Sequence, residues 1–188
     1  MDASKGCYNK TMSRPVHMHK AGVAPHFRKA GLLDLPFIFN QIMEGAVDGA
    51  FTERFLTAKG NLHLFRLLFL NLLPFNRLLG KYRIYDFLMF QRGEDDLGFV
   101  GIHTGHDDGN TTVGFYGIAN EHRGKKYGSW MMASLIEYLP ADARIAVYTT
   151  EYSVAMQHIL LKAGFKRTPS PQGSKAKFFI LSRHKPEN

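Results

Sequence analysis

The chain has 188 residues, of which 24 are lysine or arginine and 16 are aspartate or glutamate, giving a net charge of +8. A chain of this length folds most simply as one domain that buries about 70% of the surface exposed by the unfolded chain. The positive charge favours anionic ligands, such as nucleotide phosphates, nucleic acid or an anionic membrane surface. The single cysteine, Cys7, excludes an internal disulfide and a cysteine-based zinc site, which fits a cytoplasmic location.

The beginning of the chain is polar. Residues 1–25 lack the apolar core of a signal peptide, so we expect a flexible N-terminal tail followed by a single domain at residues 26–188. His17 and His19 have a spacing that suits a metal ion, but no carboxylate lies near them to complete a ligand set. We therefore predict no metal site.

The first part of the expected domain combines a strand with helices. Residues 26–30 suit a strand, and Asp34 is expected to cap a helix over residues 35–45, where apolar side chains recur on one face. Residues 51–79 are expected to form one or two helices.

Residues 62–73 form the most apolar stretch, because only His63, Arg66 and Asn71 interrupt a run of leucine and phenylalanine. Twelve residues are too few to span a bilayer, which needs about 20. Lys59, His63 and Arg66 fall on one helical stripe, so the helix is expected to bury most of its circumference. Three interpretations stay open: a core helix or homodimer contact, an apolar wall of a substrate-binding site, and a peripheral membrane contact.

Three strand-like runs follow, at residues 82–91, 97–104 and 111–118. Turn-forming residues 107–110 separate the last two runs, which predicts a β-hairpin. Beyond it we expect helices at residues 124–139 and 152–163, and strands at residues 144–150, 165–167 and 177–182. Gly164 suits a left-handed end for the second of these helices. The order of elements predicts a mixed α/β sheet.

Residues 111–139 read as a strand, a short turn and a helix, which together make a cradle for an anion. The first turn of a helix leaves backbone N–H groups unpaired and carries the positive end of the helix dipole, so a phosphate is stabilised there. The turn adds three cations and two glycines that allow close backbone approach: Arg123, Lys125, Lys126, Gly124 and Gly128.

Residues 115–139, together with residues 153–165 and their ending Lys-Ala-Gly-Phe, resemble the GNAT superfamily of acetyl-CoA-dependent N-acetyltransferases. The family's phosphate turn reads Gln/Arg-x-x-Gly-x-Gly/Ala. Arg123 and Gly128 fit this pattern, and Lys126 stands in place of the first glycine. The resemblance implies a mostly antiparallel central sheet with helices on both faces, and acetyl-CoA as the acyl donor.

The resemblance also implies roles for individual positions. Tyr116, Gly117 and Ile118 match the strand whose backbone pairs with the pantetheine arm, and the Ile118 N–H matches a donor to the thioester oxygen. Ser153 matches a position that often contacts the cofactor. The pyrophosphate turn corresponds to Arg123, Gly124, Lys125, Lys126, Tyr127 and Gly128, and Ser129 extends it into the helix.

Two positions depart from the family pattern. Lys126 carries a Cβ, which right-handed backbone geometry tolerates, and its ammonium adds charge to the phosphate site. Leu160 stands where many members have a tyrosine that protonates the departing thiolate. Leucine has no proton to give, so another group must supply it or the thiolate leaves without one.

Four residues are candidates for proton transfer. A hairpin turn centred on residues 107–108 sets His103 opposite Thr112, on the strand that lines the acceptor cleft in the family, and histidine suits proton removal near neutrality. Glu121 lies beside the phosphate turn. Tyr148 and Tyr152 flank the end of a strand near the expected thioester and are candidates to replace the missing acid.

These observations favour an N-acetyltransferase in which an amine attacks the thioester directly. Glu44 and Asp48 are candidates to recognise a cationic amine, whose identity the sequence leaves open. One alternative is transfer of a longer acyl chain, if residues 62–73 line a channel. A second alternative is a non-catalytic acyl-CoA-binding module. Nucleic-acid binding is disfavoured, because no groove-reading helix or aromatic RNA-binding pattern is present.

Overall fold

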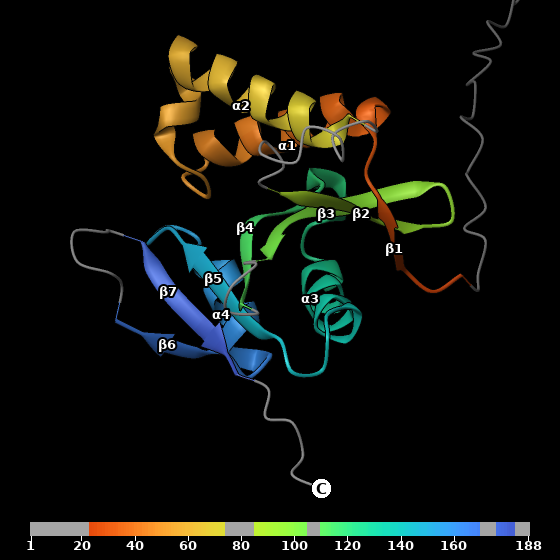
Figure 1. Cartoon of the computed structure of the whole chain (residues 1–188), viewed down its shortest axis with the longest axis vertical. Helices are drawn as coiled ribbons and strands as arrows, with labels where there is room; N and C mark the ends of the chain where they lie inside the picture. The colour runs from red at the N-terminus through yellow and green to blue at the C-terminus, as the bar shows by residue number, and fades with distance from the viewer. Residues whose placement is uncertain (1–22, 74–84, 105–109, 170–175, 183–188) are drawn as a thin grey trace, which may run out of the picture.

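The computed structural model describes residues 23–73, 85–104, 110–169 and 176–182 (Figure 1). The expected N-terminal tail lies outside them, apart from residues 23–25. The strands are β1 (His26–Lys29), β2 (Asp86–Arg92), β3 (Asp95–Thr104), β4 (Asn110–Ile118), β5 (Arg144–Thr149), β6 (Lys166–Thr168) and β7 (Lys177–Leu181). The α-helices are α1 (Leu35–Val47), α2 (Ala58–Leu72), α3 (Tyr127–Tyr138) and α4 (Val154–Lys162). Short 3-10 helices occur at η1 (Leu32–Asp34), η2 (Glu53–Leu56) and η4 (Asn120–His122).

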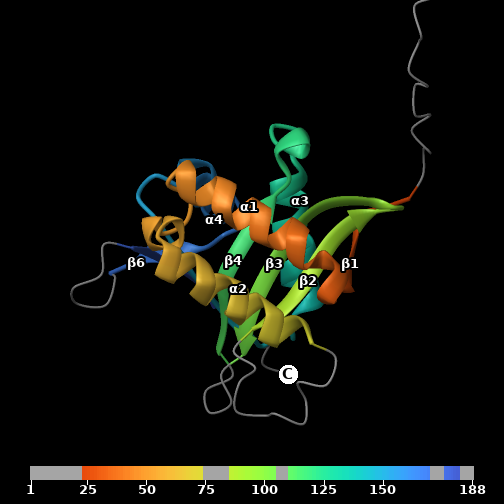
Figure 2. The same ribbon diagram turned by 90° about the horizontal axis from the view of Figure 1, so that it is seen from above.

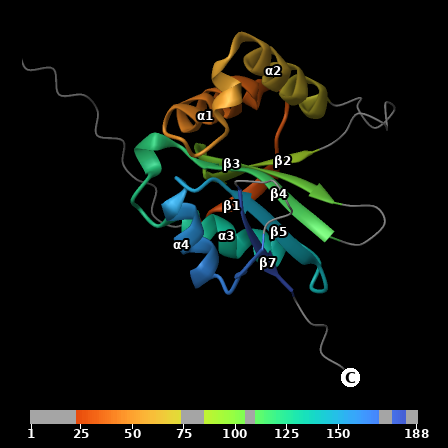
Figure 3. The same cartoon turned by 90° about the vertical axis from the view of Figure 1, so that its left-hand side faces the viewer.

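The strands form one seven-stranded sheet in the order β1-β2-β3-β4-β5-β7-β6. Among the described strands, β4 and β5 are the one parallel pair of neighbours, and all the others run antiparallel. Helices α1 and α2 lie on one side of the sheet, and α3 and α4 lie on the other (Figure 3). The expected mixed, mostly antiparallel sheet with helices on both faces is confirmed.

Each face of the sheet has its own apolar core. Ile38 of α1 and Leu64 of α2 pack with Phe99 of β3 on one face. Met132 of α3 and Leu160 of α4 pack with strand residues such as Val147 on the other. Figure 2 shows α1 and α2 crossing over the middle strands when the molecule is seen from above.

The expected hairpin is confirmed by antiparallel pairing of β3 with β4, and His103 lies opposite Thr112 as predicted. The register shifts between Gly101 and Ile102, which are opposite Phe115 and Val113 respectively. Gly114 is therefore the extra residue of a β-bulge, which increases the local twist of β4.

Asp34 has a different role from the one expected. Its side chain makes no capping bond to α1, which begins instead with a proline in its first turn. The Asp34 carboxylate accepts two bonds of 2.7 Å from the Arg28 guanidinium and one of 2.8 Å from the Gly31 N–H. Arg28 also pairs with Asp96 at 3.1 Å. The capping prediction is therefore wrong, because a cation on β1 takes up the carboxylate.

Helix α2 buries less of its circumference than expected. The buried stripe consists of Leu64, Leu68 and Leu72. Three apolar side chains remain exposed, by 68%, 44% and 38%: Leu62, Phe65 and Phe69. A homodimer or membrane contact through this face stays a prediction. No helix in the described part of the chain has the length and apolar character needed to cross a membrane.

Replacing Asp34 tests the ion-pair cluster. Asp34→Ala is expected to lower the free energy of unfolding by about 2 kcal/mol, because it leaves Arg28 half-buried with fewer partners. Burial raises the pKa of Asp34, but the bonds from Arg28 and Gly31 outweigh it and the net pKa is lowered. The stabilisation is therefore present above about pH 4 and lost as the pH falls through the lowered pKa.

Urea unfolding from about pH 7 down to about pH 3 measures both effects. Asp142→Ala, at an exposed carboxylate, serves as the control. Equal stability of the two variants at neutral pH would contradict the assigned role of Asp34.

Candidate functional site

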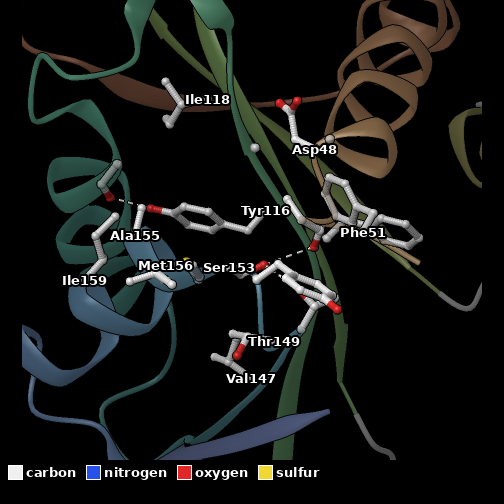
Figure 4. Close-up of a pocket in the computed structure, with 18 of the residues that line it drawn as sticks. Asp48, Phe51, Tyr116, Ile118, Val147, Thr149, Ser153, Ala155, Met156 and Ile159 are labelled. Carbon is white, nitrogen blue, oxygen red and sulfur yellow. Dashed lines mark hydrogen bonds between the residues drawn. The ribbon is translucent and has the colours of Figure 1, made fainter. Parts of the chain in front are cut away.

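A pocket of about 780 Å³ lies where β4 and β5 separate. Its walls come from β4, the end of β5, the start of α3, one face of α4, and the segment from α1 to η2. Figure 4 shows Tyr116 reaching across this space from β4, with Met156 and Ile159 of α4 below it and Phe51 on the side of α1.

The separation of β4 from β5 exposes backbone groups to the pocket. The two strands pair only as far as Val113 and Val147, and β4 continues to Ile118. Just beyond β4, the Ala119 N–H donates to the Leu97 carbonyl of β3 at 3.0 Å. Because backbone groups alternate along a strand, those of Tyr116 and Ile118 point away from β3 and into the pocket. An extended chain of amides can therefore pair with β4 there.

The turn after β4 leads into the N-terminus of α3, which begins at Tyr127 rather than at residue 124. The Trp130 N–H donates to the Lys126 carbonyl at 3.1 Å, so the N–H groups of residues 127–129 precede the helical ladder. Tyr127 is buried and anchors the turn against Trp130. The N–H groups that were predicted to bind an anion thus belong to the first turn of α3, and anion binding there stays a prediction. Lys125 is the one residue of the expected turn that does not line the pocket.

Gly128 lies where the turn, β4 and α4 meet. A Cβ there would be 2.9 Å from Ile159 Cδ1, so a longer side chain has to enter the pocket or displace Ile159. The Tyr116 hydroxyl donates to the Gly128 carbonyl. Burial raises the pKa of Tyr116, so this residue stays protonated and holds the start of α3 against β4.

The backbone at Lys126 is left-handed, with φ of 67°. The expectation of right-handed geometry is therefore wrong. Glycine adopts this conformation freely, whereas a residue with a Cβ has a steric strain of about 1 kcal/mol there. Among the described residues, Lys126 is the one non-glycine with positive φ.

The C-terminal end of α1 is tied to the phosphate turn across the pocket mouth. Arg123 donates to the Ile118 carbonyl and pairs with Asp48, both at 3.2 Å. Nearby, the Asn120 side chain donates to Glu44 at 2.6 Å. Both carboxylates considered for amine recognition therefore hold the turn in this structure.

A second set of bonds ties the same end of α1 to the start of α4. The Thr150 hydroxyl donates to the Gly49 carbonyl at 2.7 Å, and the Ser153 hydroxyl donates to the Ala50 carbonyl at 3.2 Å. Ser153, expected to contact the cofactor, lines the pocket and also fixes the loop that leads from α1 to η2.

The candidates for proton transfer lie in different places. Tyr148 and Tyr152 line the pocket. Tyr148 stacks on Phe178, and the neighbouring Glu151 raises the pKa of the exposed Tyr152. His103 and Glu121 are exposed and lie outside the pocket lining.

Leu160 is fully buried in the core beneath α4 and does not line the pocket either. The α4 residues that line it are Val154, Ala155, Met156, His158 and Ile159. Within the described lining, the one titratable side chain that α4 contributes is therefore the exposed imidazole of His158.

Two polar residues of the pocket lining were not predicted from the sequence as site residues. The Thr149 hydroxyl and the Gln41 Oε1 are buried and have no hydrogen-bond partner among the described residues. Three phenylalanines of the pocket were also missed as site residues: Phe51, Phe55 and Phe115. No α2 residue in the described chain lines the pocket, so the interpretation of residues 62–73 as an acceptor wall is not supported.

Comparison with known proteins identifies related sequences and folds. The family model described as Acetyltransferase (GNAT) family matches residues 65–165. A search of curated proteins finds no match.

Several solved structures share the fold over about the same part of the chain. An acetyltransferase from Thermus thermophilus is 13% identical, with a TM-score of 0.62 over 85% of this chain and 97% of that chain. The aminoglycoside acetyltransferase AAC(6')-Ib, in complex with ribostamycin and coenzyme A, is 15% identical, with a TM-score of 0.65 over 85% and 94%. RimL, a ribosomal L7/L12 alpha-N-protein acetyltransferase in complex with coenzyme A, is 11% identical, with a TM-score of 0.64 over 86% and 96%.

Replacing Lys126 tests the strained turn. Lys126→Gly is expected to raise the free energy of unfolding by about 1 kcal/mol, because glycine adopts positive φ without steric cost. Lys126→Ala is the matched control, because it removes the charge and keeps the Cβ. Thermal unfolding of the two variants measures the difference. A glycine variant no more stable than the alanine variant would show that the turn is not left-handed in solution.

Proposed function

The chain belongs to the GNAT acetyltransferase family, and on that premise we propose that it transfers the acetyl group of acetyl-CoA to the nitrogen of an amine. The observation that carries the proposal is the separation of β4 from β5 beside the start of α3. Acetyl-CoA is the donor that this geometry fits, and structural neighbours were solved with coenzyme A bound.

The proposed cofactor site has two parts. The pantetheine amides pair with the pocket-facing backbone of Tyr116 and Ile118, as an added strand pairs with a sheet edge. The pyrophosphate is bound by the N–H groups of residues 127–129 and by the side chains of Arg123 and Lys126. The pair between Arg123 and Asp48 is solvent-exposed and therefore weak, so Arg123 can move from the carboxylate to the phosphate.

The proposed reaction needs no covalent enzyme intermediate. The neutral amine attacks the thioester carbonyl, a backbone N–H of β4 such as that of Ile118 stabilises the oxyanion, and the carbon–sulfur bond breaks. Tyr148 and Tyr152 are the proposed proton donors to the thiolate, because both line the pocket. His103 and Glu121 are weaker candidates, because contact with the reacting atoms would require a rearrangement.

A second candidate function is a non-catalytic acyl-CoA-binding module. It is favoured by Leu160, which occupies the family's proton-donor position, and by the position of His103 outside the pocket lining. Both functions require a complete cofactor site, and they differ only in turnover.

Two measurements separate these functions. Calorimetry with acetyl-CoA is expected to detect binding in either case, and absence of binding contradicts both. Release of free thiol from acetyl-CoA across a panel of amines is expected for the acetyltransferase. Binding without amine-dependent thiol release would establish the binding module instead.

Gly128→Glu tests the phosphate site directly. A carboxylate within about 4 Å of the pyrophosphate is expected to weaken acetyl-CoA binding by about 100-fold or more, because two anions repel in a partly desolvated site. Gly128→Gln has almost the same size without the charge and is expected to weaken binding by a smaller factor. Calorimetry measures both affinities, and thermal unfolding checks that both variants fold. Equal affinities for the two variants would contradict a phosphate at this position.

A further inference from the structure

The pocket continues through the opening between β4 and β5 to the side of the sheet covered by α1 and η2. There its wall is aromatic, formed by Phe51, Phe55 and Phe115. The Phe115 ring centroid lies 6.1 Å from that of Phe51 and 6.4 Å from that of Phe55. We call these three side chains the aromatic wall.

The aromatic wall is held rigidly from behind. Phe115 is buried, and its ring centroid lies 5.1 Å from that of Tyr85 and 5.6 Å from that of Phe87, neither of which lines the pocket. Phe51 packs against Gly45 of α1, where a Cβ would be 2.7 Å from the ring. Because its members are fixed by packing, the wall presents a preformed apolar surface.

Negative charge is scarce around this surface. Among the described residues that line the pocket, Asp48 has the one carboxylate, and it already pairs with Arg123 at the mouth. Arg123 and Lys126 make the remaining fixed charge of the lining positive. A ligand with several ammonium groups would find this single carboxylate at most in the described lining, even when a phosphate takes Arg123 from it, and the protein's net charge of +8 also repels it.

We propose that this arm of the pocket binds the acceptor, and that the acceptor is a monoamine carried on an aromatic or other compact apolar group. The proposal rests on the acetyl-transfer function above and names its substrate class. The ring of the acceptor packs on the aromatic wall, and its nitrogen points to the opening between β4 and β5.

Apolar surroundings also assist the chemistry. Desolvation disfavours the ammonium form of an amine, so the acceptor loses one proton to water as it enters and becomes nucleophilic. Its nitrogen then bonds to the acetyl carbon as the carbon–sulfur bond breaks, and a second proton passes from nitrogen to the thiolate. One ammonium and one acetyl-CoA thus give an amide, CoA thiol and a released proton. Gln41 and Thr149 line the pocket, and their unpartnered oxygens, which are buried in this structure, would accept the remaining N–H bonds after a rotation of the side chain.

The amine panel for this test contains 2-phenylethylamine, spermidine and glycinamide, each with saturating acetyl-CoA. The expected result is a kcat/KM for 2-phenylethylamine at least about tenfold above that for either polar amine, as for a preformed apolar pocket. Faster transfer to spermidine or glycinamide overturns the proposal and leaves acetyl transfer itself intact.

Variants then assign the preference to the aromatic wall. Phe55→Ala and the milder Phe55→Leu are expected to lower kcat/KM for 2-phenylethylamine, by about tenfold for alanine, with little effect on spermidine. Phe65→Ala, at an exposed phenylalanine of α2 outside the pocket lining, is the control. It is expected to leave kcat/KM unchanged for both 2-phenylethylamine and spermidine. Equal losses on all amines for the Phe55 variants would contradict specific recognition.

Direct binding separates this proposal from the proposed function. Calorimetric titration of 2-phenylethylamine into the CoA-loaded protein is expected to give binding that Phe55→Ala weakens and Phe65→Ala does not. If no amine is acetylated but this pattern holds, the acetyl-transfer function fails and the apolar amine site remains. If amines are acetylated and 2-phenylethylamine does not bind, the apolar acceptor class is wrong and the acetyl-transfer function stands.

Discussion

The structure depends on one interruption of backbone pairing. β4 and β5 are parallel neighbours, but their pairing ends at Val113 and Val147 while β4 runs on to Ile118. In a closed sheet the backbone groups of this last segment would bond to a neighbouring strand, and here they face a pocket. The β-bulge at Gly114 adds twist just where the strands part. The same opening connects the α3 and α4 side of the sheet with the α1 and η2 side, so two ligands can meet edge to edge within it.

The end of α1 links the two sides of this opening. Glu44 and Asp48 bond to the phosphate turn, while the carbonyls of Gly49 and Ala50 accept bonds from the start of α4. The first pair of contacts is exposed and exchangeable, whereas the second fixes the loop that leads to Phe51. In the proposed complex, a phosphate that takes Arg123 therefore frees Asp48 without releasing the aromatic wall. The proposed cofactor site and the proposed acceptor site would in this way be connected through a single helix end.

Local sequence patterns predicted much of the fold. Alternating apolar residues and the turn-forming run after β3 gave the hairpin and its register, with His103 opposite Thr112. Features that arise from contacts across the fold were not predictable. The positive φ of Lys126 depends on how the turn meets α3, and Asp34 is held by a cation on a neighbouring strand rather than by its own helix. The aromatic wall brings together residues about 60 positions apart in the sequence, and no periodic pattern of residues predicts that they come into contact.

The distribution of titratable groups explains how the site can work without the family's tyrosine on α4. Leu160 faces the core and His158 is the one titratable side chain that α4 adds to the described lining, while the proposed acceptor arm is apolar because the aromatic wall lines it. An amine transferred into such surroundings becomes neutral because its charged form loses hydration, which removes the main task of a strong base. In the proposed reaction the remaining proton must reach sulfur, and the phenols of Tyr148 and Tyr152 line the same pocket. In the proposed reaction, the apolar wall therefore lowers the need for a general base through desolvation, and the proton donor to sulfur comes from β5 and its following turn rather than from α4.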